Sequence, residues 1–428
     1  MAFWCVSALF PAVSPALSLE DAVKQGLQNS LNLKKSLIDL SSAEYSAKRL
    51  WAEVFPSISG SAGISYSGSE LFTGDGFELD KGKLNTSVNA GINLNFNAGI
   101  PYSMKNIKLA YQTRLLNYED ARNQLEIQIT KNFYSLIADR DNLASLEYML
   151  QLAQRQYEKD QVSFRNGLIG EMVLMQSRLG LENARYNLSA ARSAYANRMR
   201  DFLSQLGVTQ DTNIALEGKI EITKIEVDAE SLINKHLPRR PDIISKRQEI
   251  ERLENAQKQL NAAGKAPSLD LSANWAGRNL YSFTDIDIPF SDNLGGSATI
   301  RIPLDPWIPG TSKSQSVHAA KLAVDKARLD LQSAEDAAVT QIRSLAANLR
   351  SSWDNIEIAR LSLTFAERGY NLTEQGFRNG TVESLKLGDA RNNLINARQR
   401  LLQTELSYLN MILDISAALN ISWKDLMK

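Results

Sequence analysis

Phe164-Arg165-Asn166-Gly167 recurs word for word as Phe377-Arg378-Asn379-Gly380, and this repetition decides how the rest of the sequence is interpreted. The offset of 213 residues (377 − 164) holds without a gap from Asp141 through Leu206, which match Asp354 and Leu419. Over those 66 positions 21 residues are identical, where composition alone gives roughly four. The chain is therefore a tandem duplication, with repeat 1 at residues 17–209, a more polar linker at 210–229 and repeat 2 at 230–428.

Each repeat contains two stretches in which apolar and polar residues alternate with a period of two. They lie at about 57–67 and 84–97 in repeat 1, and at about 268–276 and 296–304 in repeat 2. Such alternation predicts strands with one apolar and one polar face. The polar face is rich in Ser and Asn, and parity places Asn89, Asn93 and Ser297 on it. The segments 67–83 and 277–293 are rich in Gly, Ser and Asp and are predicted to be the connecting loops.

The alternation of apolar and polar residues is compatible with two interpretations of these strands. A hairpin half-buried on a soluble core is the commoner case. Each strand also reaches the ~9 to 11 residues that cross a bilayer at a tilt, but the smallest transmembrane barrels have about eight strands. With four strands per chain, a barrel would have to be shared between chains. After Leu17, no stretch approaches the ~18 to 20 apolar residues of a membrane-spanning helix.

Helical periodicity occupies most of the remaining sequence. Residues 19–53 are predicted to form a first helix, which Pro56 closes. Long helices are predicted at about 103–165 and 168–207 in repeat 1, and at about 312–378 and 381–420 in repeat 2. Their apolar residues are spaced three, four or seven positions apart, as in the apolar seam of a coiled coil. A helix of roughly 60 residues is about 90 Å long. The Asn-Gly pairs at 166–167 and 379–380 supply the left-handed turns that end the first helix of each pair.

Composition excludes several classes of function. Lys+Arg and Asp+Glu are both 48, so the net charge gives no electrostatic reason to expect nucleic acid as a partner. Cys5 is the only cysteine and His236 and His318 are the only histidines, which excludes a Cys/His zinc cage, a disulfide framework and a Cys–His nucleophile pair. The sequence contains no phosphate-binding loop, nucleophile elbow or zinc-protease motif. We therefore predict neither an enzyme nor a metal or cofactor site.

Residues 1–16 are predicted to be a signal peptide. Ala2 to Leu17 is the only long apolar run, and Ser14-Pro15-Ala16 has the small-x-small pattern that suits cleavage before Leu17. The usual basic segment is missing, because no Lys or Arg precedes Lys24. The segment predicts export from the cytoplasm, and Cys5 lies within it.

The sequence resembles the TolC-like outer-membrane factor family, whose members are the exit ducts of Gram-negative efflux pumps and type I secretion systems. Besides the duplication, the resemblance lies in Leu17-Ser18-Leu19-Glu20-Asp21-Ala22, in Leu237-Pro238-Arg239-Arg240-Pro241-Asp242-Ile243, and in the paired Asn-Gly-Leu and Asn-Gly-Thr turns. It implies an α+β membrane protein of the Gram-negative outer membrane that extends into the periplasm. It also implies a homotrimer, in which four strands per chain make a shared 12-strand transmembrane β-barrel and the helices make a long periplasmic α-helical barrel.

The function that this resemblance implies is the exit duct of a tripartite efflux pump. Such a duct passively conducts small-molecule cargo, which could be a drug, a metal or a metabolite, from an inner-membrane transporter and a periplasmic adaptor to the outside. A type I protein-secretion duct of the same fold is the first alternative. A soluble coiled-coil scaffold is the second, although a scaffold has no need of alternating strands.

The resemblance also suggests site residues at the tips of the helix hairpins. Adaptor contacts in the family fall here on Asn166, Gly167, Leu168, Asn379, Gly380 and Thr381, although an Asn-Gly pair caps a helix whatever binds there. Of the residues that close the tips in the best-studied member, only Asp389 matches, whereas Phe377, Val382, Val173 and Lys386 differ. The candidates for a tip constriction are Glu171, Glu383, Lys386 and Asp389, each of which a three-fold axis would make into a ring of three. We hypothesise that Lys386 pairs with an acidic neighbour across the constriction; a solvated helix end is the alternative.

Overall fold

The structure is a computed structural model that describes residues 16–67, 83–208, 214–282 and 291–426. The predicted signal peptide up to residue 15, most of the predicted loop 67–83, residues 283–290 of the predicted loop 277–293 and residues 210–213 of the linker lie outside these ranges. The chain divides into two compact units. The helical unit comprises Met1–Ile38, Leu116–Ile244 and Ser333–Lys428, and the sheet unit comprises Asp39–Leu115 and Ser245–Gln332.

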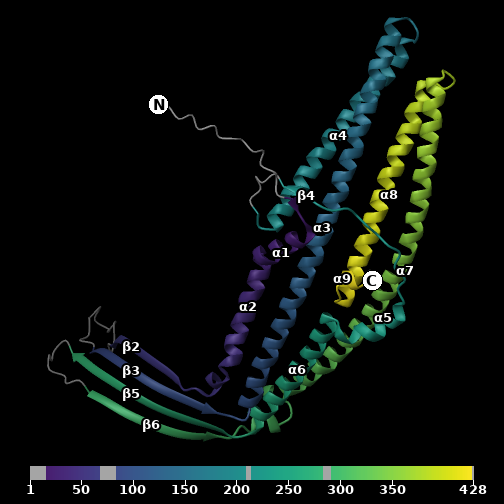
Figure 1. Cartoon of the computed structure of the whole chain (residues 1–428). Coiled ribbons are helices and arrows are strands. Elements are labelled where there is room, and N and C mark those ends of the chain that lie inside the picture. Colours follow the sequence, from purple (N-terminus) through teal and green to yellow (C-terminus); the bar gives the residue numbers. More distant parts are fainter. Residues whose placement is uncertain (1–15, 68–82, 209–213, 283–290, 427–428) are drawn as a thin grey trace, which may run out of the picture. The chain divides into compact units, whose positions relative to one another are not determined.

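The order of elements repeats along the chain, as the sequence predicted (Figure 1). β1 (Ala16–Leu17) begins at the last residue of the predicted signal peptide and continues into repeat 1. Repeat 1 then contains α1 (Leu19–Asn29), α2 (Leu31–Lys48), η1 (Leu50–Val54), β2 (Ser57–Ser67), β3 (Lys83–Phe96), α3 (Ile100–Arg165) and α4 (Glu171–Gln205). After β4 (Ala215–Leu216), repeat 2 contains α5 (Ala229–His236), η2 (Leu237–Arg239), α6 (Pro241–Lys265), β5 (Ser268–Ser282), β6 (Ser291–Arg301), η3 (Asp305–Trp307), α7 (Ser312–Arg378), α8 (Ser384–Leu419) and α9 (Trp423–Leu426). Within the described ranges, no helix is both long and apolar enough to span a membrane.

The expectation of one continuous first helix at 19–53 is wrong, because the helix breaks at Ser30. The Ser30 backbone leaves the helical region, with φ −54° and ψ 119°. Its Oγ then accepts a hydrogen bond from the Leu33 N–H at 3.3 Å, which caps the start of α2. Serine favours such caps because its short side chain competes with the helical hydrogen bonds of the backbone.

The strands of repeat 2 are also displaced from their predicted bounds. β5 continues to Ser282 and β6 begins at Ser291, so the predicted loop 277–293 is partly strand. β6 ends at Arg301 instead of residue 304. Pro303 lies just beyond that end, and proline has no N–H to donate to a strand ladder.

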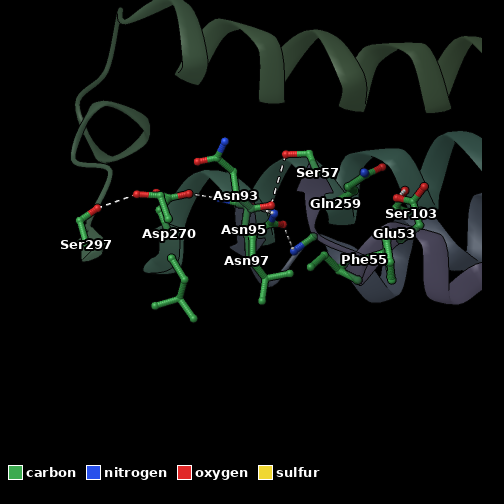
Figure 2. A pocket seen from close by; sticks show the side chains of 15 residues that line it. Glu53, Phe55, Ser57, Asn93, Asn95, Asn97, Ser103, Gln259, Asp270 and Ser297 are labelled. Atoms are coloured by element: carbon green, nitrogen blue, oxygen red, sulfur yellow. Dashed lines mark hydrogen bonds between the residues drawn. The ribbon is translucent and has the colours of Figure 1, made fainter. Parts of the chain in front are cut away.

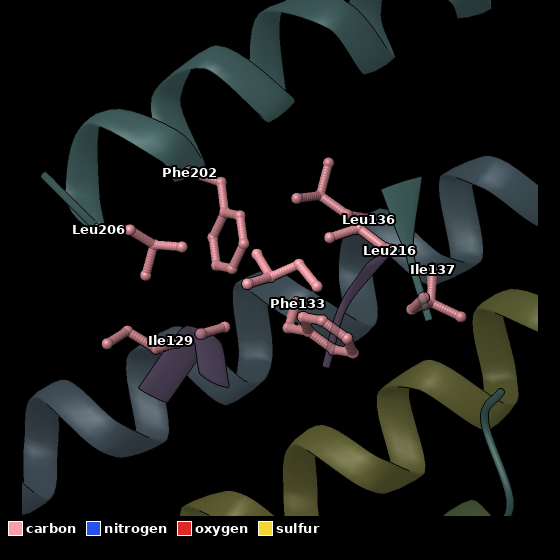
Figure 3. Close-up of a cluster of buried hydrophobic side chains, with 9 residues drawn as sticks. Ile129, Phe133, Leu136, Ile137, Phe202, Leu206 and Leu216 are labelled. Carbon is pink, nitrogen blue, oxygen red and sulfur yellow. The ribbon is translucent and has the colours of Figure 1, made fainter. Parts of the chain in front are cut away.

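Apolar side chains at helical spacing build two equivalent clusters in the helical unit. Figure 3 shows the first, in which Ile129 and Phe133 of α3 face Phe202 and Leu206 of α4. Its repeat-2 counterpart contains Ile342, Leu349 and Ile356 of α7 with Tyr408, Ile412 and Leu419 of α8. Gly26 lets α1 approach the first cluster closely, because a Cβ there would lie 2.3 Å from the Cδ1 atom of Ile129.

The Arg-Pro-Asp element fixes the start of α6 within the helical unit. Arg240 is only 8% exposed. Its Nε and Nη2 donate to the two carboxylate oxygens of Asp242 at 3.0 and 2.8 Å, and Nη2 also donates to Gln341 of α7 at 3.2 Å. Burial would raise the pKa of Asp242, but the hydrogen bonds and charge of Arg240 outweigh it and hold that pKa below its usual value.

Tyr408 attaches the linker to the α7–α8 hairpin. Its side chain is fully buried, and its ring meets Trp353 edge-on with a centroid distance of 5.3 Å. The hydroxyl donates to the Thr223 carbonyl at 3.2 Å and accepts from the Ile225 N–H at 2.9 Å. A single hydroxyl therefore satisfies a backbone acceptor and a backbone donor of the linker.

We expect Tyr408→Phe to lower the free energy of unfolding by about 1–2 kcal/mol, because it leaves the partly buried Ile225 N–H without an acceptor. The thermal unfolding midpoint of the detergent-solubilised chain, followed by circular dichroism, measures the effect. Tyr195 is the repeat-1 counterpart, and its hydroxyl forms no hydrogen bond to the described residues. Tyr195→Phe is therefore the matched control and should leave the midpoint nearly unchanged; equal shifts in the two variants would contradict this role of Tyr408.

Candidate functional site: a two-faced sheet and two helix-hairpin tips

The four long strands of the sheet unit form one antiparallel sheet in the order β2-β3-β5-β6 (Figure 1). The central pair, β3 with β5, joins repeat 1 to repeat 2 over the register from Lys83↔Ser282 to Phe96↔Leu269. In the described part of the chain, β2 and β6 each have a partner on one side only. A strand with an unpaired edge is a ready template for another strand.

One face of this sheet is predominantly apolar across all four strands, with polar exceptions that include Thr86 near the start of β3 and Asp292 near the start of β6. The register places Ile58 opposite Ile92 and Trp275 opposite Leu294, so the apolar positions of neighbouring strands coincide. The face is formed by Ile58, Ile64, Val88, Ile92, Leu94, Phe96, Leu269, Leu271, Trp275, Leu294 and Ile300. Ile64 and Leu294 are 74% and 77% exposed. An exposed apolar surface of this kind marks a site of contact with lipid or another protein.

The opposite face is polar and carries the residues that parity assigned to it. Asn89 lies opposite Ser61 and Asn93 opposite Ser57, and the Asn89 Nδ2 donates to the Ser61 Oγ at 3.4 Å. Ser297 lies opposite Ser272, and the two hydroxyls are 2.8 Å apart. The predicted polar positions of both repeats therefore form one continuous surface.

A hollow of about 370 Å³ lies where this polar face meets the segments that lead to and from the helices (Figure 2). Asn93, Asn95, Asp270 and Ser297 line it from the strands. Amides and hydroxyls dominate the wall, and Asn95 donates to the Asp270 carboxylate. A surface of this composition stays hydrated, because each polar group keeps partners in water or in its neighbours.

The segments that enter and leave the sheet carry exposed aromatic side chains. Trp51 and Phe55 precede β2 and meet edge-on at a centroid distance of 5.1 Å. Trp307 follows β6, with the Lys265 Nζ 5.1 Å from its ring centroid. Aromatic side chains at strand ends are typical of a membrane–water interface.

The two hairpin tips of the helical unit close through the same backbone geometry. At the end of α3, the Gly167 N–H donates to the Phe164 carbonyl at 2.9 Å and the Leu168 N–H donates to the Ser163 carbonyl at 2.8 Å. The end of α7 repeats both bonds, from Gly380 to Phe377 at 3.1 Å and from Thr381 to Gly376 at 2.9 Å. Gly167 and Gly380 have φ values of 70° and 75°. Glycine adopts this left-handed conformation without the penalty that a Cβ brings.

The adaptor-contact candidates therefore lie in two turns of the same hydrogen-bonded geometry. Asn166, Gly167 and Leu168 form one turn, Asn379, Gly380 and Thr381 form the other, and all six are exposed. Near the tips, the two hairpins touch where the Lys159 Nζ of α3 lies 4.4 Å from the ring centroid of Phe377 on α7. This contact was not foreseen from the sequence.

The constriction candidates lie at the starts of α4 and α8. Glu171, Glu383, Lys386 and Asp389 are all exposed. Glu383 is the residue before α8 and makes no side-chain capping hydrogen bond. Within the described ranges of a single chain, these four side chains form no ion pair with one another.

Two exposed apolar stripes run along the helical unit and were missed by the sequence analysis. The α4 stripe consists of Met172, Met175, Leu179 and Tyr186, and the α7 stripe of Ile358, Leu361, Phe365 and Leu372. In each stripe, successive residues are three, four and seven positions apart in the sequence. Each stripe therefore lies on one face of its helix. The sequence did contain a signal for these stripes, because their apolar residues occupy a second set of heptad positions beside those of the buried seam.

The described residues contain no group of three or more His, Cys, Asp or Glu side chains arranged to hold a metal ion. The candidate functional surfaces of the described chain are the two-faced sheet, the two hairpin tips and the exposed stripes.

Comparison with known proteins gives a family match over both repeats. Residues 22–208 and 232–420 match the family described as outer membrane efflux protein. The two matched segments correspond to the two halves of the duplication.

Individual relatives are distant but cover most of the chain. The antibiotic efflux pump outer membrane protein ArpC of Pseudomonas putida is 23% identical over 433 residues, covering 95% of this chain and 83% of that protein. The outer membrane protein TolC of Escherichia coli is 21% identical over 422 residues, with 96% and 83% covered.

Among solved structures, the Campylobacter jejuni CmeC outer membrane channel has a similar fold. The TM-score is 0.73 at 20% sequence identity, and the match covers 94% of this chain and 85% of that one. The architecture is thus shared with a known outer membrane channel.

Proposed function

Because this chain belongs to the outer membrane efflux protein family, we propose that it is the exit duct of a tripartite efflux pump. It is an efflux channel of the Gram-negative outer membrane and not an enzyme. In the proposed function, an inner-membrane transporter supplies the energy and a periplasmic adaptor joins that transporter to the hairpin tips. The duct itself carries small molecules passively to the outside.

The observation that carries this proposal is the two-faced, open-edged sheet. An apolar face suits lipid, and a Ser- and Asn-rich face suits a water-filled lumen. Four strands are too few to close around a lumen, whereas β6 of one copy pairing with β2 of the next would bring three copies to twelve strands. Closure of this kind also removes the unpaired edges.

The internal repeat supports a closed ring for the helices as well. The 213-residue offset relates the α4 stripe to Leu385, Gly388, Asn392 and Gln399 of α8. Asn392 and Gln399 face the α3–α4 hairpin of the same chain across a groove. Both the α4 stripe and the α7 stripe are apolar and exposed in the single chain, so we propose that the α4 stripe of one copy packs against the α7 stripe of the next. Contacts then alternate within and between chains around a closed ring.

Both tips suit the proposed contact with an adaptor. Leu168 is 74% exposed on a turn that is held by the hydrogen bonds of the Gly167 and Leu168 N–H groups. Because the backbone of the turn is already held in place, an apolar side chain on it binds a partner with a smaller loss of conformational entropy than one on a free segment. We assign the adaptor contact to Asn166, Gly167, Leu168, Asn379, Gly380 and Thr381.

For the cargo, we favour small molecules over secreted proteins. The relative from Pseudomonas putida is named for antibiotic efflux, and that name supports a small organic cargo for this chain. The alternative, a type I secretion duct, shares the fold. A scaffold would leave both the apolar sheet face and the family match without explanation.

The proposal is tested by purifying the chain from outer membranes in detergent, measuring its mass, and recording single-channel current in a planar bilayer. We expect a trimer with discrete conductance steps. A water-soluble monomer or dimer without conductance would overturn the duct. Export of a small fluorescent substrate by cells that also contain the cognate transporter and adaptor distinguishes efflux from protein secretion.

We further propose that Lys386, with acidic neighbours of adjacent copies, narrows the tip. Lys386→Ala should then raise the single-channel conductance, because three cations and their ion pairs leave the constriction together. Lys386→Arg keeps the charge and serves as the matched control, with conductance close to that of the unaltered protein. An unchanged conductance in Lys386→Ala would contradict this role.

A further inference from the structure

A groove of about 680 Å³ lies between the two hairpins of the helical unit, within one chain. Its walls come from α3, α4 and α8. The volume is within the range of small-molecule sites, roughly 300–1,000 Å³. Neither hairpin tip nor any constriction candidate lines it.

Arg391 of α8 is the only charged side chain among the residues that line this groove. It is partly buried, and no residue of the described chain forms a hydrogen bond or ion pair with it. Burial lowers the pKa of its guanidinium, and this effect outweighs the opposing charge interaction with Tyr370. The phenol of Tyr370 is neutral near pH 7, because burial raises its pKa further above the usual value near 10. The groove therefore contains an uncompensated cation.

The surroundings of Arg391 combine an open approach with further hydrogen-bond donors. Gly180 lies opposite, and a Cβ built on it would be 3.8 Å from the Nη2 atom of Arg391. The amide side chains that line the groove belong to Asn142, Asn183, Asn187, Asn392, Asn396 and Gln399. Gln399 donates to Asn142 at 3.1 Å, which ties α8 to α3 across the groove. Amides can donate to an anion without adding charge of their own.

The remaining wall is apolar. It is formed by Leu146, Met149, Ala153, Ala184, Ala191 and Ile395. A ligand complementary to the whole groove would have an anionic group that binds Arg391 and the amides, and an apolar part that packs against this wall.

We propose that this groove is a binding site for organic carboxylates. The carboxylate pairs with the Arg391 guanidinium in the fork geometry that arginine offers, and the amides of Asn392 or Asn396 complete its hydrogen bonds. The apolar body of the ligand packs on the α3 side of the groove. The site lies in a single chain and goes beyond the duct function, since neither a barrel nor an adaptor contributes to it.

The internal repeat provides a matched control for the test. Arg178 of α4 occupies the position in repeat 1 that corresponds to Arg391, but it is exposed and does not line the groove. Arg391→Gln and Arg178→Gln therefore remove the same charge from equivalent positions, and only one of them changes the groove.

The experiment is equilibrium binding of dansylglycine, a fluorescent carboxylate, to the full chain in a non-ionic detergent. We expect saturable binding that Arg391→Gln weakens by about tenfold or more, and that Arg391→Lys restores in part. Arg178→Gln should bind like the unaltered chain. Dansylamide has the same apolar body without a carboxylate, and it should bind at least about tenfold more weakly than dansylglycine.

A second variant keeps the charge and fills the groove. Gly180→Leu places a side chain against the guanidinium and should also abolish dansylglycine binding, with the helical circular dichroism signal retained. Equal affinities of Arg391→Gln and Arg178→Gln, or equal affinities for dansylglycine and dansylamide, would overturn the proposal. So would the absence of saturable binding to the unaltered chain. None of these outcomes depends on channel conductance, so they are distinguishable from a failure of the proposed duct function.

Discussion

Replacing Leu361 and Phe365 together by Glu will convert the proposed trimer into folded monomers. Both side chains belong to the exposed α7 stripe, and Phe365 is 68% exposed in the single chain. In the proposed assembly they are buried against the α4 stripe of the next copy, where two unpaired carboxylates would cost several kcal/mol per interface. A closed trimer has three such interfaces, so the loss of assembly should be nearly complete. Light scattering of the detergent-solubilised protein measures the mass directly.

Asn371→Glu is the control for this prediction. Asn371 is exposed on the same helix, but it points about 100° away from Leu372 and so lies off the stripe. It introduces a carboxylate without entering the proposed interface, and the trimer should survive. A stable trimer in Leu361→Glu/Phe365→Glu would show that the α7 stripe does not mediate assembly, and the ring of alternating contacts would have to be abandoned.

Val88→Lys will prevent stable insertion of the sheet, whereas Asn89→Lys will be tolerated. Val88 lies near the middle of β3 on the apolar face, opposite Ala62 of β2 and Gly277 of β5. A lysine on the lipid face near the bilayer midplane costs about 2–4 kcal/mol, and each trimer carries the substitution three times. One such cost of about 2 kcal/mol already corresponds to a roughly 30-fold change in an equilibrium constant.

The adjacent residue supplies the control, because successive residues of a strand point to opposite faces. Asn89 lies on the polar face opposite Ser61 and Ala276, where a lysine stays hydrated in the proposed lumen. The measurement is the fraction of each variant that is recovered as trimer from the outer-membrane fraction. If Asn89→Lys is lost and Val88→Lys is retained, the proposed assignment of lipid and lumen faces is reversed.

The fold was predictable where local chemistry dominates. Gly167 and Gly380 end their helices in the left-handed conformation because an L side chain is penalised there, and no distant contact is needed for that choice. The two faces of the sheet follow in the same way, since a strand has a side-chain period of two. Val88 and Asn89 had to lie on opposite faces wherever the strand was placed.

The predictions from sequence were wrong where a single hydrogen bond, or a proline that lacks a backbone N–H, overrode the spacing of the apolar residues. The apolar periodicity of 19–53 runs through Ser30 without interruption, yet the hydrogen bond from Leu33 to the Ser30 hydroxyl divides the helix. Alternation in repeat 2 continues to Leu304, yet Pro303 cannot join a ladder and β6 ends before it. Heptad stepping identified the buried seam at Ile129 and Phe133, but it could not show that a second set of positions stays exposed.

The sequence by itself determined the duplication, the order of elements, the two hairpin turns and the polarity of each strand face, because these depend on residues close together in the chain. Only the tertiary structure decided that β3 pairs with β5 across the repeats and that Tyr408 holds the linker. It also decided that Arg391 is partly buried without a hydrogen-bond or ion-pair partner among the described residues, while its counterpart Arg178 is exposed. Repeat-equivalent positions have similar local sequence and different neighbours. Their roles diverge because burial and pairing are properties of what surrounds a side chain, and residues far away in the sequence supply those surroundings.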